Sequence, residues 1–151
     1  MVGQESESHR YAGPAMDKQR LDLIDRFYEA FSRRHVDAVL ELCHEDVEIY
    51  KDPDVVEMVS ALTPRGSERV AQYLNGWLDS WDMYQPRVSD LREAGEHDVV
   101  ALVDVHARGR GSQFDIEEEI ADVLTFRGDR LARLRLHVTR EEALRATGLE
   151  I

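Results

Sequence analysis

The stretch FDIEEEIADVLTF, residues 114–126, is followed by the turn RGDR and by LARLRLHV, residues 131–138. In both segments apolar residues alternate with polar ones, which is the two-residue period of a β-strand with one buried face. The glycine-containing turn between them predicts a hairpin. In the first strand two acids, Glu118 and Asp122, fall in the same row as apolar residues such as Ile120. A carboxylate in such a row either finds a partner or keeps its proton near neutral pH. Asp122 is therefore the first candidate for a functional residue.

The neighbours of Asp122 depend on the length of the turn, because a one-residue change of register moves every side chain of a strand to the other face. A two-residue loop places Arg135 opposite Asp122, and a three-residue loop with a bulge places Leu134 there. Leu134 belongs to the apolar row of the last strand, so matching of apolar rows favours the longer loop and leaves Asp122 without an arginine. The polar rows then face each other: Arg133 and Arg135 with Glu117 and Glu119. The alternative is an acid at the wet edge of the sheet, or one neutralised by a nearby arginine.

The rest of the chain is organised as one domain. Residues 1–15 are polar and lack periodicity, which predicts a disordered lead-in ahead of a single domain formed by residues 16–151. Apolar spacing of three and four residues predicts helices at 16–31, 35–43 and 67–81, and more weakly at 54–62. Alternation predicts strands at 46–50, 88–92, 98–108, 114–126 and 131–138.

The helix ends also carry signals. Ser67 can cap the third helix, and Thr139 with Glu142 fits a capping box for a last helix that stops at Gly148. Helices followed by consecutive hairpins indicate an α+β domain, in which the helices cover one face of a largely antiparallel sheet.

The strand at 98–108 is apolar on both faces, which predicts a second cover and hence a homodimer packed through the sheet. Asp104 and His106 share one of these faces. If that face is the one beneath the helices, pairing about Arg110 and Gly111 brings Asp104 near Glu118, and the group could supply a base, an acid and an orienting carboxylate. The alternative is that His106 and Glu118 lie in water near the charged hairpin tip.

Composition excludes several classes of protein. With 31 acidic and 19 basic residues the net charge is −12, so neither nucleic acid nor a membrane surface is an expected partner. The single cysteine, Cys43, lies in an apolar pattern typical of packing, and no signal or membrane segment is evident, which predicts a cytoplasmic protein. The histidines show no metal-ligand spacing and no glycine-rich loop precedes a helix, so neither a metal nor another cofactor is expected.

The order of several segments resembles that of SnoaL-like proteins of the nuclear-transport-factor-like superfamily. The segments are LIDRFYEAF, VDAVLELCHEDVEIY, RGSERVAQYLNGWLDSW, RGRGS, LTFRGDRLARLRLHV and REEALRATGL, and the resemblance covers residues 17–149. It implies a cone-shaped, curved antiparallel β-sheet with a mixed edge, wrapped around N-terminal helices and enclosing an apolar pocket. It specifies the fold more than the activity, because the group includes polyketide cyclases, ketosteroid isomerases, limonene epoxide hydrolases, dehydratases and non-catalytic binders.

Comparison with ketosteroid isomerase places Asp122 on the protonated aspartate that binds an oxyanion. Where that enzyme has a tyrosine on its first helix, this chain has Phe27 with Tyr28 adjacent. The general-base aspartate of that enzyme falls near Lys51 or Asp52.

Comparison with limonene epoxide hydrolase places Asp104 on one of its catalytic aspartates. The accompanying arginine and second aspartate fall on Leu102 and Leu136, so the resemblance does not extend to that triad.

The residues and the resemblance together predict cofactor-free acid/base chemistry of isomerase, cyclase or hydratase type. The substrate would be a small apolar oxygenated molecule, such as a polyketide, steroid-like or terpenoid compound. Asp122 would be the acid, and Asp104, with His106, the base. Further ligand contacts are expected from inner-face and aromatic residues: Tyr28, Tyr50, Trp77, Trp81, Glu118, Ile120, Leu134 and Leu136. Trp77 is expected mainly to pack, as aromatic stripes usually do. The alternatives are a ligand-binding protein without chemistry and a dimeric interaction protein of the same fold.

Overall fold

The computed structural model describes residues 17–50, without the side chain of Tyr50, and residues 64–148. The expected lead-in at 1–15 and the expected helix at 54–62 lie outside these residues. The helices are α2 (Lys18–Ser32), α3 (Val36–Glu41), α5 (Ser67–Asp79) and α6 (Arg140–Thr147). The strands are β1 (Cys43–Tyr50), β2 (Trp81–Ala94), β3 (Asp98–Gly109), β4 (Asp115–Arg127) and β5 (Arg130–Val138).

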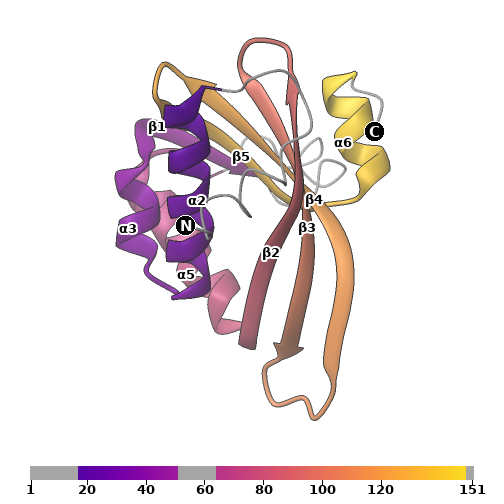
Figure 1. Ribbon diagram of the computed structural model, residues 1–151. Helices are drawn as coiled ribbons and strands as arrows, with labels where there is room; N and C mark the ends of the chain where they lie inside the picture. Colours follow the sequence, from indigo (N-terminus) through magenta and orange to yellow (C-terminus); the bar gives the residue numbers. More distant parts are fainter. Residues whose placement is uncertain (1–16, 51–63, 149–151) are drawn as a thin grey trace, which may run out of the picture.

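A single curved sheet organises the described part of the chain (Figure 1). Its strand order is β1-β5-β4-β3-β2. Strands β2 to β5 form consecutive antiparallel hairpins, whereas β1 pairs in parallel with β5 at the edge. Helices α2, α3 and α5 lie together on one side of the sheet, and α6 lies on the other. The α+β cone with a mixed edge is therefore confirmed.

The sheet has an apolar core on each side. The inner face, which α2, α3 and α5 cover, carries the larger core, and its β3 residues are Val99, Ala101, Val103, Val105 and Ala107. The outer face carries a smaller core beneath Ala143 of α6, formed by Val100, Leu102, Ala121, Val123 and Val138. The prediction that β3 is apolar on both faces is confirmed. The second cover is α6 of the same chain, so the homodimer stays a prediction.

The capping residues predicted for α6 are confirmed, whereas the one predicted for α5 is not. The hydroxyl of Thr139 accepts from the Glu142 N–H at 3.0 Å, and Glu142 accepts from the Thr139 N–H at 2.8 Å, so the capping box is confirmed. Gly148 ends the helix in the left-handed region, at φ 71°. The expected cap at Ser67 is wrong, because Ser67 is already helical and Gly66 is the N-cap.

The longest departure from the predicted elements is β2, which begins at Trp81 instead of residue 88. Its first half does not alternate cleanly and contains Pro86, which normally argues against a strand. As β2 is an edge strand, a residue without an N–H is tolerated there. The second predicted helix is likewise shorter than expected, since Cys43 begins β1 as a buried residue of the inner core.

The register of the β4–β5 hairpin differs from the prediction. Arg127 pairs with Arg130, so the loop has two residues and the prediction of a longer loop is wrong. Bulges further along shift the pairing, and Val123 then faces Arg135. Arg133 contacts Glu48 of β1 at 3.5 Å.

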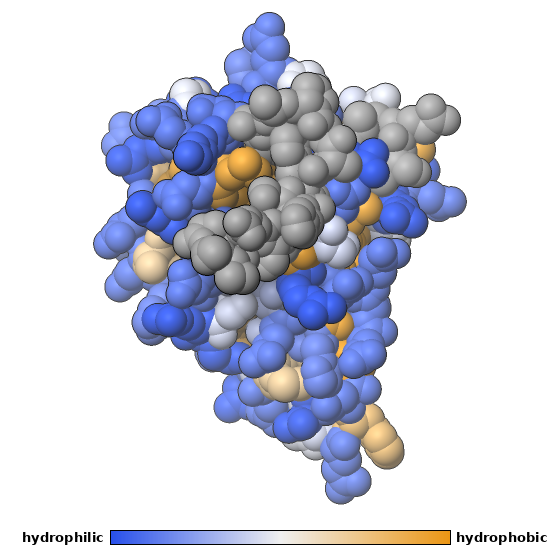
Figure 2. All heavy atoms as spheres, in the orientation of Figure 1, coloured by the Kyte–Doolittle hydropathy of each residue, from blue (hydrophilic) through white to orange (hydrophobic). Residues whose placement is uncertain are grey.

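The visible surface is largely polar. Hydrophilic side chains predominate on the face shown in Figure 2. Among the described residues, none of the helices has the length and apolar character needed to cross a bilayer.

Candidate functional site

Asp122 of β4 points into the inner core, where it is 5% exposed. The Tyr28 hydroxyl of α2 donates to its Oδ2 at 2.5 Å, and the backbone N–H of His137 donates to its Oδ1 at 2.8 Å. Burial raises the pKa of Asp122 to about 6, although both hydrogen bonds act to lower it. Burial and the neighbouring charge of Asp122 also raise the pKa of Tyr28. Asp122 is therefore the buried acid that the apolar row of β4 predicts, and its hydrogen bonds within the described residues come from Tyr28 and His137.

A β-bulge positions the second donor. Ala121 pairs with Val138 and Val123 with Arg135, so Asp122 alone lies opposite two residues of β5, Leu136 and His137. His137 adopts a left-handed conformation with φ 62°. Bulges free a backbone group from the strand ladder, and here the N–H of His137 turns to the carboxylate of Asp122.

The imidazole of His137 joins two further polar groups to this site. Its Nε2 lies 2.9 Å from Oε1 of Glu118, and its Nδ1 lies 3.2 Å from the Tyr84 hydroxyl. Burial and the charges of Asp122 and Glu118 raise the pKa of Tyr84. His137 and Tyr84 were not predicted from the sequence: His137 belongs to the polar row of β5 in any regular register, and Tyr84 lies in the unpredicted half of β2.

Aromatic rings pack next to these polar side chains. Trp77 of α5 lies with its ring centroid 4.6 Å from that of Tyr84 and 5.8 Å from that of Phe31. Trp81 contacts both Trp77 and Tyr84 at 5.9 and 5.5 Å. The buried indole N–H of Trp81 has no hydrogen-bond partner among the described residues.

Two predicted catalytic residues lie elsewhere. Val103, Val105 and Ala107 occupy the inner face of β3, so Asp104 and His106, which alternate with them, project from the outer face. Asp104 is exposed opposite Glu119 instead of Glu118, and His106 contacts Asp115 at 2.9 Å. The assumption that their face lies beneath the helices is wrong, because both faces of β3 are partly apolar and alternation alone did not distinguish them.

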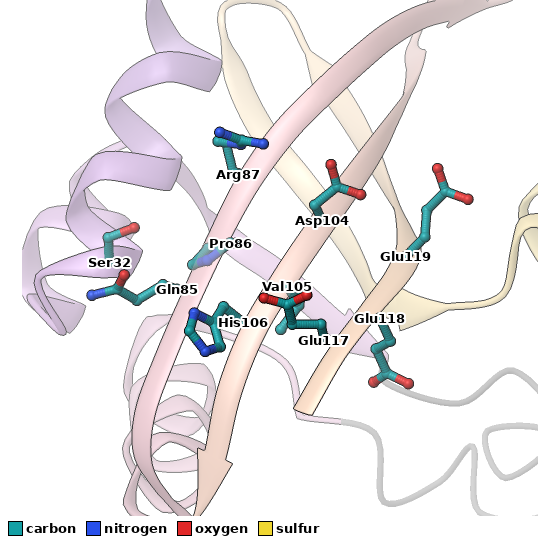
Figure 3. A pocket seen from close by; sticks show the side chains of 10 residues that line it. All are labelled: Ser32, Gln85, Pro86, Arg87, Asp104, Val105, His106, Glu117, Glu118 and Glu119. Carbon is teal, nitrogen blue, oxygen red and sulfur yellow. The ribbon is translucent and has the colours of Figure 1, made fainter. Parts of the chain in front are cut away.

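A hollow of about 780 Å³ adjoins Asp104 and His106. Figure 3 shows its lining on the neighbouring strands β2, β3 and β4 and at Ser32 of α2, with carboxylates of Asp104, Glu117 and Glu119 among the side chains. Asp122 does not line this hollow. The apolar pocket expected around Asp122 therefore stays a prediction.

The other predicted ligand contacts gather on the inner side of the sheet. Ile120, Leu134 and Leu136 are buried in the inner core, and Trp77 and Trp81 pack against it. Glu118 reaches the site through His137. The side chain of Tyr50, another predicted contact, lies outside the described residues. Within the described part of the chain no group of three or more acidic, histidine or cysteine side chains is arranged to hold a metal ion.

The model of the SnoaL-like domain matches residues 24–134. The chain belongs to the SnoaL-like family. No curated protein matches the sequence at a significant level.

Solved structures share the SnoaL-like fold at low sequence identity. An NTF2-like protein of unknown function from Burkholderia pseudomallei superposes with a TM-score of 0.68 at 19% identity, covering 88% of this chain and 100% of that one. A protein with a ketosteroid isomerase-like fold from Catenulispora acidiphila, in complex with trimethylamine, gives 0.64 at 15%, covering 85% and 94%. A putative polyketide cyclase from Sinorhizobium meliloti gives 0.59 at 16%, covering 76% and 92%.

One expected departure from ketosteroid isomerase is corrected by the geometry. The sequence comparison left Asp122 without the tyrosine of the first helix, but in this SnoaL-like domain Tyr28 of the first described helix donates directly to Asp122. The bond joins residues 94 positions apart. Sequence periodicity alone could not pair them.

Proposed function

We propose that this SnoaL-like protein binds a small, largely apolar oxygenated molecule on the inner side of its sheet and carries out acid/base chemistry of isomerase, cyclase or hydratase type on it. The observation that carries the proposal is the Tyr28–Asp122 hydrogen bond of 2.5 Å inside an apolar core. A buried acid whose pKa lies near neutrality, beside a hydroxyl donor, is the arrangement that such chemistry uses.

The pair could act on a ligand oxygen in two ways. Because its pKa is raised to about 6, Asp122 can hold or release a proton close to neutral pH. A protonated Asp122 donates its O–H, and the Tyr28 hydroxyl is then released to donate in turn. Two O–H donors in a site that excludes water stabilise negative charge that develops on a ligand oxygen.

The surroundings support an apolar ligand. Half-buried Trp77 and Trp81 supply flat aromatic surface next to the polar group, and such surface suits polyketide, steroid-like or terpenoid compounds. The indole N–H of Trp81, which lacks a partner among the described residues, is a donor that a ligand oxygen could satisfy. Similarity to putative polyketide cyclases from Sinorhizobium meliloti and Xanthomonas campestris is in keeping with this class.

Binding without chemistry is the second candidate, and one observation favours it. Both oxygens of Asp122 already accept hydrogen bonds from donors of the protein. That satisfied arrangement is typical of a structural carboxylate that stabilises a bulge. The same inner site would then hold a ligand without moving a proton.

Turnover separates the two candidates. Ligand that co-purifies with the protein, identified by mass spectrometry, provides the compound for the assay. We expect Asp122→Asn and Tyr28→Phe to retain binding of that compound and to lose most of its conversion. The matched control is Asp104→Asn, which removes an exposed carboxylate from the outer face. Unchanged conversion in Asp122→Asn, or no conversion by the wild type, would contradict the acid/base proposal.

A further inference from the structure

His137 adopts a backbone conformation that is uncommon for residues other than glycine. Its φ of 62° lies in the left-handed region, where the Cβ atom crowds the backbone and glycine is the usual residue. It occupies one of the two bulged positions opposite Asp122, where glycine is the common choice in bulges of this conformation. Backbone strain of this kind is concentrated at functional sites.

The backbone role of His137 does not require an imidazole. Its N–H donates to Oδ1 of Asp122 at 2.8 Å, and any residue other than proline has this donor. A glycine would supply the same hydrogen bond without the strain. The reason for a histidine at this position must therefore lie in its ring.

The ring is held at both nitrogens. Glu118, when ionised, can only accept, so Nε2 at 2.9 Å carries a hydrogen. In the neutral ring Nδ1 then accepts from the Tyr84 hydroxyl at 3.2 Å, and in the charged ring it donates to that oxygen. A hydroxyl, an imidazole and a carboxylate in series are the arrangement by which proteins orient a proton-transferring histidine.

The His137 ring and Glu118 are more exposed to solvent than Asp122 is. The side chain of His137 is 18% exposed and that of Glu118 is 47% exposed, whereas Asp122 is buried. Next to Glu118 on the same inner row, Ile116 is 45% exposed. The inner face therefore emerges from its helical cover beside this ring, and a ligand that approaches along it reaches His137 before Asp122.

We propose that His137 is the proton-transferring residue of the inner site, oriented by Glu118 and Tyr84 and joined to Asp122 through its own backbone N–H. This proposal rests on the proposed function. Because the Tyr84 hydroxyl occupies Nδ1, the proton passes through it. The Tyr84 O–H bond breaks as an Nδ1–H bond forms, and the Tyr84 oxygen takes the proton of the ligand, whose O–H or C–H bond breaks with the electron pair left on the ligand. Glu118 balances the imidazolium charge, and the Tyr84 hydroxyl changes from donor to acceptor toward Nδ1. Among the described residues, the charged and titratable groups near the ring include Glu118 and Asp122 of β4, Tyr84 of β2 and Tyr28 of α2.

The first part of the test needs no ligand. In the full chain, the ring of His137 and the carboxyl carbon of Asp122 are followed by NMR as the pH is changed. We expect the titration midpoint of His137 to move to lower pH in Glu118→Gln and, by a smaller amount, in Asp122→Asn, because each removes a negative charge close to the ring. The matched control is His106→Gln, which breaks a histidine–carboxylate contact of the same 2.9 Å on the outer face. An unchanged His137 titration in both site variants would overturn the proposal.

The second part uses 4-nitrophenol as the probe, because its absorbance reports whether the bound phenol has lost its proton. We expect wild type to bind it partly as the phenolate, and His137→Gly to bind it with that ionised fraction reduced several-fold. His137→Asn repeats the measurement in a residue that tolerates the left-handed region, should the glycine variant fold poorly. An ionised fraction that stays at the wild-type level in both variants, with the probe still bound, would contradict this proposal alone. Failure of wild type to bind the probe would contradict the proposed function, and this proposal with it.

Discussion

Asp122 makes the stability of the protein depend on pH in the direction opposite to that of most carboxylates. Burial raises its pKa from 3.8 to about 6, so between about pH 4 and pH 6 the unfolded chain has released this proton while the folded chain keeps it. Ionisation of Asp122 therefore removes stability as the pH rises through this window. The difference between the two pKa values corresponds to about 3 kcal/mol once the group is fully ionised.

The substitution Asp122→Asn removes this dependence, because an amide does not titrate. We expect the free energy of unfolding of wild type, minus that of the variant, to fall by about 2 kcal/mol between about pH 4 and pH 7, because part of the full difference already falls below pH 4. Urea denaturation of both proteins at four pH values across this range measures the difference. A difference that stays constant with pH would refute the assignment of Asp122 as a buried acid with a raised pKa.

Two further variants test the direction in which stability changes with pH. Tyr28→Phe removes a hydrogen bond that lowers the pKa of Asp122, so it should extend the window of falling stability above pH 6. For Asp115→Asn, the free energy of unfolding of wild type minus that of the variant should rise with pH instead of falling. Hydrogen bonds from Arg108 and His106 lower the pKa of Asp115, and its contribution is therefore present at neutral pH and lost as the pH falls.

Three other predictions concern stability and assembly. Thr139→Ala breaks the capping box of α6 and should lower the free energy of unfolding by about 1 kcal/mol, whereas Ser67→Ala, at a position that is not a cap, should change it little; urea denaturation measures both. His137→Gly should be more stable than His137→Ala by about 1 kcal/mol, because glycine adopts the left-handed region without strain, and equal stability in the same assay would argue against that conformation. Helix α6 leaves part of the outer face uncovered (Figure 1), so we expect two copies of the chain to form a homodimer through this face. Light scattering at micromolar concentration should show the dimer, and salt should strengthen it by screening the repulsion between Asp104, Glu117 and Glu119. A monomer at both low and high salt would contradict this prediction.

The fold was predictable because its local signals agree with one another. Alternation identified β3, β4 and β5, and the capping box and Gly148 bounded α6. Strand β2 was missed over its first half, where Pro86 interrupts an irregular pattern that only an edge position tolerates. A sequence pattern does not reveal which strand will be at the edge.

The site was predictable only in part. The apolar row of β4 identified Asp122, and the aromatic and apolar neighbours followed from the same reasoning. The choice of face for Asp104 and His106 failed, because β3 is apolar on both sides and the cover of the outer face, α6, comes from the end of the chain. The role of His137 could not be predicted, because Val138 falls on the same apolar row as Leu134 and Leu136 and the alternation of β5 shows no change of phase.

The bulges between β4 and β5 explain why Asp122 is an acid that can hold its proton. With the two-residue loop at Gly128 and Asp129, an uninterrupted ladder would place Arg135 directly opposite Asp122. An adjacent arginine lowers the pKa of a carboxyl group and would fix Asp122 as a permanent anion. The two bulges displace β5 along β4, so that Arg135 faces Val123 and the amide of His137 takes its place. A neutral donor lowers the pKa less than a full positive charge does, and burial then prevails. The two bulges, and not the choice of aspartate alone, therefore make the site capable of exchanging a proton near neutral pH.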